Sequence, residues 1–141
     1  MIRRHLFPAL AGVALLGSVG CSRADRTYPA EFQVLSQKQP AAGATVVLHP
    51  VGNTDPAAPR PTGKVDEAGV VKLSTFGEND GAPPGDYVVT VVWYDVTSTP
   101  EQAVAIKGGD KLKGRYRRPD GPTAPRVTIQ KQTNQLPPLE L

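Results

Sequence analysis

The chain has 141 residues, with 16 basic and 13 acidic side chains, one cysteine and two histidines. A single cysteine excludes a disulfide framework within the chain, and a formal net charge of +3 gives no support to a nucleic-acid partner. The length suits one domain with a modest core.

The first twenty residues have the pattern of a signal peptide. Arg3 and Arg4 precede an apolar run from Leu6 to Gly20. About fifteen apolar residues are too few to cross a bilayer as a helix, and they match the apolar region of an export signal. The two arginines belong to an ordinary basic start, or to a twin-arginine signal, which RRHLF loosely resembles. Removal of residues 1–20 leaves 14 basic and 13 acidic side chains, so we expect no nucleic-acid partner.

Cys21 would then be the first residue of the mature chain. The stretch LLGSVGC resembles a bacterial lipobox, although Ser18 stands where that motif usually has leucine. Acylation would remove the hazard of an unpaired thiol in an exported protein, and several acyl chains anchor a protein stably. We therefore expect lipidation at Cys21 and a membrane-anchored lipoprotein that faces the periplasm or the cell surface. Ordinary secretion is the alternative.

Residues 21–29 form a short polar tether, and residues 30–141 are expected to form one all-β domain, a single antiparallel β-sandwich. No window shows sustained helical spacing, and proline and glycine recur every few residues, as between short strands. The C-terminal leucines, Leu136, Leu139 and Leu141, are expected to lie on the core. The expected strands are marked by Phe32 and Val34; Ala44, Val46 and Leu48; Val71 and Leu73; Tyr87, Val89, Val91 and Trp93; and Val127 and Ile129.

The acidic stretch GENDGAPPGDY has two interpretations. Pro84 and Gly85 are typical of a corner before a strand, with the Tyr87 ring reaching the core and its hydroxyl at the rim. The alternative is a calcium site, because carboxylate and amide oxygens are calcium ligands. Its spacing fits no EF-hand, so we favour the corner. The residues of the calcium alternative are Glu78, Asn79, Asp80 and Asp86.

Three stretches carry a family resemblance. AAGATVVLHP, PTGKVDEAGVVKLST and PPGDYVVTVVWY resemble the carboxypeptidase regulatory-like domain, a transthyretin-like or prealbumin-like β-sandwich, over about residues 30–95. The resemblance implies a hairpin at Asp66 and Gly69, where Asp66 bonds backbone amides and Gly69 takes a positive φ. The segments GDKLKGRYRRP and NQLPPLEL are similar to small predicted lipoproteins of planctomycete-type bacteria.

Enzyme signatures are missing from the sequence. The regulatory-like domain accompanies zinc carboxypeptidases without being their catalytic unit, and His49 is the only histidine after residue 20. Transthyretin-like hydrolases end in a Tyr-Arg-Gly-Ser motif, whereas this chain ends in PPLEL. No nucleophile elbow or phosphate-binding loop occurs. We therefore expect no enzyme activity and no cofactor, with His49 at or near the surface of a strand.

A basic segment, residues 107–131, carries eight basic side chains against two acidic ones. VAIKG and KLKGRY, both in the long segment from Val96 to Pro125, are expected as short edge strands. One hypothesis is a structural or protein-interaction module of the cell envelope; the alternative is a module that binds carbohydrate or an anionic wall polymer through residues 94–118. An exposed aromatic cluster would favour binding, and a loop packed down by Leu112 and Tyr116 a structural role. The candidate ligand residues are Tyr94, Lys111, Lys113, Arg115 and Tyr116.

Overall fold

A computed structural model describes residues 26–94 and 109–141. All regular structure in these two ranges is β-strand, which confirms the all-β prediction. Within them no helix is long and apolar enough to cross a bilayer. The predicted signal peptide, Cys21 and the first half of the tether lie outside the described residues, as does the edge strand expected at VAIKG.

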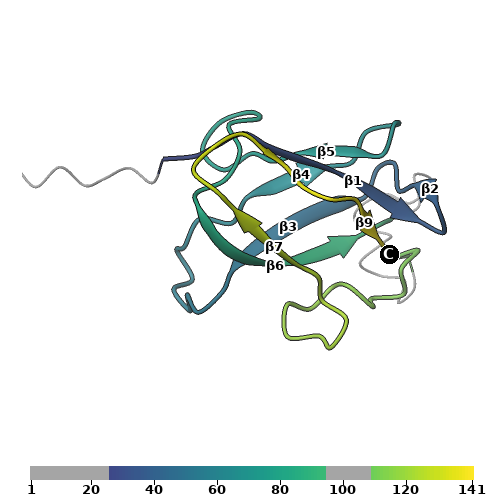
Figure 1. The fold of residues 1–141 in the computed structure, drawn as a ribbon. Coiled ribbons are helices and arrows are strands. Elements are labelled where there is room, and N and C mark those ends of the chain that lie inside the picture. Colours follow the sequence, from purple (N-terminus) through teal and green to yellow (C-terminus); the bar gives the residue numbers. More distant parts are fainter. Residues whose placement is uncertain (1–25, 95–108) are drawn as a thin grey trace, which may run out of the picture.

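Nine short strands of the described residues form two sheets that pack as a sandwich (Figure 1). One sheet is built around a single strand, β1, with which each of its other strands pairs. Its strands are β1 (Ala30–Ser36), β2 (Gln39–Pro40), β5 (Val70–Lys72), β8 (Asn134–Gln135) and β9 (Leu139–Glu140). The other sheet has the order β4 (Thr62–Lys64), β3 (Thr45–Pro50), β6 (Gly85–Val92) and β7 (Arg126–Ile129).

The core lies between the sheets and contains the predicted alternating residues. Ala44 and, on β3, Val46 and Leu48 are fully buried, whereas Thr45 is exposed and Val47 is half-buried. Strand β6 pairs with β3 on one side and β7 on the other, so it is an inner strand of its sheet. Each fully buried valine or leucine contributes about 1.5–3 kcal/mol relative to an exposed one. The three C-terminal leucines pack against this core, as expected.

The prediction of a purely antiparallel sandwich is wrong for the last two strands. β8 and β9 both pair with β1 in parallel, with Ala30 opposite Asn134 and Val34 opposite Leu139. β7 ends at the end of the sandwich where β1 begins, and the Asn134 N–H donates to the Pro29 carbonyl at 2.8 Å. The short connection after β7 therefore brings the chain to the start of β1. From that end, a strand beside β1 can only run in the same direction as β1, which makes the pairing parallel.

Both predicted turns form as expected. Asp66 Oδ1 accepts the N–H groups of Ala68 and Val70 at 2.9 and 2.8 Å, and Gly69 has a φ of 84°. After the corner at residues 83–85, the buried Tyr87 ring enters the core and its hydroxyl donates to the Pro83 carbonyl at 2.9 Å. The acidic stretch therefore begins a strand.

The sandwich has two opposite ends, which we name the tether end and the far end. At the tether end β1 begins, Tyr28 pairs with Ala82, and the connections 51–61 and 74–81 leave β3 and β5 (Figure 1). At the far end lie the turn between β1 and β2, the last residues of β6 and β9, and residues 110–116.

Candidate functional site

Residues 110–116 of the basic segment, which we name the basic turn, lie at the far end. The strand expected at KLKGRY is wrong, because residues 111–116 form consecutive turns. Lys113 has a φ of 54° and Gly114 a φ of 73°, left-handed values that an extended strand does not contain. The segment therefore folds back on itself beside the end of β6.

Asp110 fastens this turn to the sandwich. Its carboxylate accepts the N–H groups of Trp93, Leu112 and Gly114, each at 3.0 Å, and only 2% of its side chain is exposed. The Arg117 guanidinium lies 3.9 Å away. A buried carboxylate is costly unless it is hydrogen-bonded, and three backbone donors meet that need here. Asp110 is therefore the residue that shapes the basic turn.

Sequence reasoning missed Asp110, which entered only as one of two acids that offset the basic charge. The signal that could have identified Asp110 was its likeness to Asp66 in the predicted hairpin. Asp66 accepts the amides two and four residues later, and Asp110 does the same before Gly114. An aspartate followed within four residues by glycine is typical of a turn closed by the side chain.

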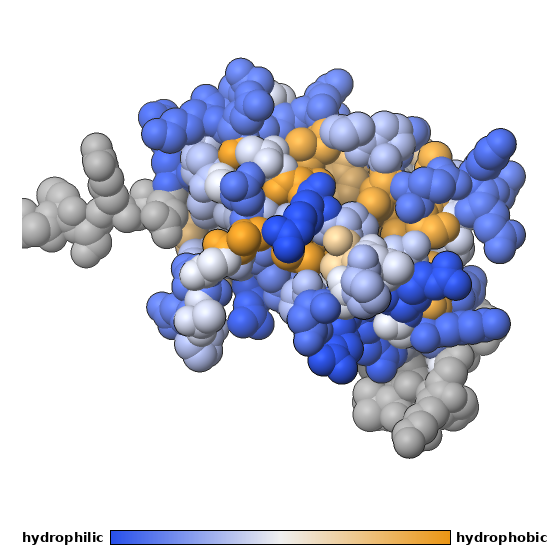
Figure 2. Space-filling model, turned by 60° about the horizontal axis from the view of Figure 1, so that its bottom comes forward, coloured by the Kyte–Doolittle hydropathy of each residue, from blue (hydrophilic) through white to orange (hydrophobic). Residues whose placement is uncertain are grey.

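Side chains of the turn alternate between the core and solvent. Leu112 is half-buried and Tyr116 is 9% exposed, and both pack against the core. Lys111, just before them, and Lys113 and Arg115, between them, are exposed. Figure 2 shows hydrophilic side chains over β7 and the preceding turns, beside hydrophobic ones that reach the surface. The turn is packed down, an arrangement that favours a structural role, yet it still presents its cations outward.

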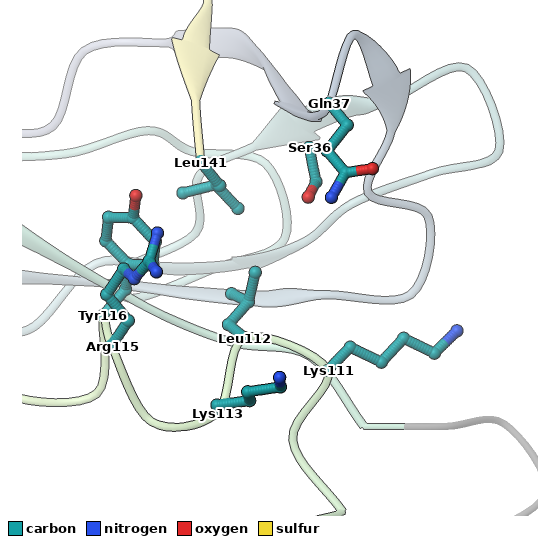
Figure 3. Close-up of a pocket in the computed structure, with 8 residues that line it drawn as sticks. All are labelled: Ser36, Gln37, Lys111, Leu112, Lys113, Arg115, Tyr116 and Leu141. Carbon is teal, nitrogen blue, oxygen red and sulfur yellow. The ribbon is translucent and has the colours of Figure 1, made fainter.

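A cavity of about 390 Å³ opens beside the turn (Figure 3). Three segments far apart in the sequence meet there: the end of β1, the basic turn and Leu141 after β9. Pairing of β9 with the end of β1 brings the first and last of them together. Ser36, Gln37, Lys111, Leu112, Lys113, Arg115, Tyr116 and Leu141 line it.

The structure thus gathers four of the five predicted ligand residues. Tyr94 does not line the cavity; it is 39% exposed and forms a bridge with Asp110. Tyr116 lines the cavity while most of its ring is buried, so the two tyrosines form no exposed aromatic platform. Sequence reasoning missed Ser36 and Gln37, because nothing local relates the first strand to the basic segment.

The cations at this end have different partners. The Lys111 ammonium lies 4.6 Å from the centroid of the Trp93 ring, and Arg118 forms a bidentate pair with exposed Asp120. Trp93 itself is half-buried against the core, as expected. Among described residues, neither Lys113 nor Arg115 has a carboxylate within 4.0 Å. These two are the cations at the cavity that an anion could neutralise.

Backbone strain gathers around the same cavity. Of the four non-glycine residues with positive φ in the described ranges, Gln37 (50°) and Lys113 (54°) line the cavity and Lys38 (63°) adjoins it. A two-residue hairpin of this kind usually contains asparagine and glycine. Strained backbone conformations cluster at binding and catalytic sites. Both turns that border the cavity, the turn after β1 and the basic turn, therefore have the strained backbone that is typical of such sites.

Two of the three acids of the calcium alternative, Asp80 and Asp86, are hydrogen-bonded within the fold. Asp80 accepts the N–H groups of Thr75, Phe76 and Gly77 at 2.7–3.1 Å. Desolvation opposes these bonds, but together they lower the pKa of Asp80 below its ordinary value. Asp86 accepts the Thr128 hydroxyl at 2.6 Å, and Glu78 is exposed. No three His, Cys, Asp or Glu side chains of the described residues gather as metal ligands.

His49 lies half-buried on the outer face of β3, as predicted. Its Nε2 lies 2.9 Å from the Thr90 hydroxyl, which in turn donates to the Val47 carbonyl at 3.4 Å. Desolvation and, after it, the charge of Arg60 lower the pKa of His49, so the neutral ring is favoured.

Comparison with known proteins adds no family to this geometry: no family model matches the chain, and no curated protein matches its sequence.

Proposed function

We propose that the chain is a non-catalytic, lipid-anchored β-sandwich module of the cell envelope, which acts by holding a partner at its far end. The observation that carries this proposal is the basic turn fastened by Asp110 and packed down by Leu112 and Tyr116. A rigid surface at the end away from the tether suits contact with another envelope component, because little order is lost on binding.

The transthyretin-like family is part of the proposal. It is supported by the positions of the motif residues: the Asp66 and Gly69 hairpin closes as the resemblance implies, and the corner before Tyr87 directs its ring into the core. Export and the anchor at Cys21 rest on the sequence pattern at residues 1–21.

The anchor has a direct test. Mass spectrometry of the purified full-length product should find acyl chains on a mature protein that begins at Cys21, and Cys21→Ser should move the protein from the membrane fraction to the soluble fraction. A mature chain without acyl groups would refute the anchor and favour ordinary secretion.

A second function, binding of an acidic carbohydrate or an anionic wall polymer, is favoured by one observation. The cavity at the far end places Lys113 and Arg115, which have no carboxylate partner among the described residues, beside the strained Gln37 turn. Polyanions meet such cations with charge-assisted hydrogen bonds.

Thermal unfolding of the protein in the presence of wall fragments and of acidic and neutral sugars separates the two functions. A ligand at a hundred times its dissociation constant stabilises the fold by about 2.7 kcal/mol. The shift should disappear in Lys113→Ala and Arg115→Ala and persist in Arg118→Ala, whose native side chain already pairs with Asp120. No shift across the panel would refute the second function and leave a protein partner, to be sought by crosslinking.

A further inference from the structure

The loop from Ser74 to Gly81 displays one large apolar side chain. Phe76 is 63% exposed, the most exposed of the large hydrophobic residues in the described ranges. Its backbone N–H donates to Asp80 Oδ2 at 3.1 Å, and the neighbouring Thr75 and Gly77 amides donate to the same carboxylate. The Thr75 hydroxyl donates to the Gly81 carbonyl at 2.6 Å. The loop is thus closed by its own hydrogen bonds, with the phenyl ring facing outward.

This loop lies where the tether joins the domain. The N–H and carbonyl groups of Tyr28 bond to Ala82, the residue directly after the loop, at 2.9 and 3.0 Å. Val51, which is 45% exposed, leaves β3 at the same end, since Pro50 pairs with Tyr87 near the start of β6. Two of the three exposed large hydrophobic residues in the described ranges therefore lie at the tether end.

The length of the tether limits how far this end can be from an anchor. Cys21 is five residues from Arg26, the first described residue. Five residues span at most about 18 Å even when fully extended. Once Cys21 is held in the membrane, a second contact between the domain and that membrane is intramolecular. Even a weak apolar contact is then populated.

We infer that the tether end of the sandwich faces the bilayer and that Phe76 enters the membrane interface. This inference rests on the proposed anchor at Cys21. The contact is apolar, because the loop itself carries the acidic Glu78 and Asp80 and no basic side chain. The cavity beside Lys113 and Arg115, at the opposite end, then points away from the membrane.

Tryptophan fluorescence of the full lipoprotein tests this orientation. The purified protein is reconstituted in phosphatidylcholine vesicles, with or without bromine on the acyl chains as a quencher. Trp93 is the chain's only tryptophan and lies at the far end, so the native protein supplies the baseline. Phe76→Trp adds a probe at the tether end, and Tyr94→Trp adds a matched exposed probe at the far end.

We expect brominated lipid to quench the emission added by Phe76→Trp and to leave the native and Tyr94→Trp emission unchanged. Equal quenching of both added probes, or of neither, in a protein shown by its mass to be acylated would overturn the orientation while the anchor stands. A mature protein without acyl chains would overturn the anchor and this inference with it.

Discussion

Replacement of Asp110 by alanine should be the most destabilising single change in the basic turn. It removes the acceptor for the N–H groups of Trp93, Leu112 and Gly114. A buried donor without a partner costs about 1–3 kcal/mol. Water can reach some of the three N–H groups when the turn opens. We therefore expect the free energy of unfolding to fall by about 3 kcal/mol, less than the sum of three full desolvation costs.

The assay is urea unfolding of the soluble chain that starts after Cys21, followed by far-ultraviolet circular dichroism. With a urea dependence of about 1–3 kcal/mol per molar, a 3 kcal/mol loss lowers the midpoint by about 1–3 M. Asp110→Asn, which keeps one acceptor oxygen, should lose about half as much. Asp120→Ala is the control, because its side chain is 68% exposed and solvent screens an exposed ion pair. If Asp110→Ala were no more destabilising than this control, Asp110 would not hold the turn.

Three further changes test other parts of the fold. Gly81→Ala should lower the free energy of unfolding by about 2–3 kcal/mol, because φ is 88° and a Cβ would overlap a neighbouring carbonyl. The control Gly52→Ala, with a φ of 74° and open space, should lower it by only about 1 kcal/mol. Equal losses of stability in the two variants would contradict the overlap. The pKa of His49 is lowered in the folded protein, so its contribution to stability is present above pH 6.5 and is lost as the pH falls from 6.5 toward the pKa of the folded state. An NMR titration that gave His49 an ordinary or raised pKa would refute this. Tyr87→Phe should cost about 1 kcal/mol through the lost hydroxyl bond, against a negligible change for exposed Tyr94→Phe in the same melts.

The strands with alternating residues could be predicted from the sequence, because burial on one face leaves a period-two pattern. β3 shows this pattern clearly, with Val46 and Leu48 fully buried, Thr45 before them exposed and Val47 between them only half-buried. β8 and β9 could not be found in this way, since two residues carry no alternation and their partner strand lies about a hundred residues earlier.

The candidate site was predicted in part for the same reason. Charge density pointed to Lys111, Lys113 and Arg115, which do border one cavity. The other wall, Ser36 and Gln37, is supplied by long-range pairing that leaves no trace in local sequence. The KLKGRY strand was wrong because a side-chain acceptor, Asp110, competes with extended pairing for the same amides.

The parallel pairing of β1 with β9 has a mechanical consequence. The two strands lie side by side with Val34 opposite Leu139. A force that pulls the start of β1 one way and the end of β9 the other slides these strands past each other, so their hydrogen bonds are strained together. A hairpin pulled apart from its open end would instead lose its bonds one after another. With the proposed anchor at the tether and the proposed partner at the far end, a pulling force would act along this stronger direction.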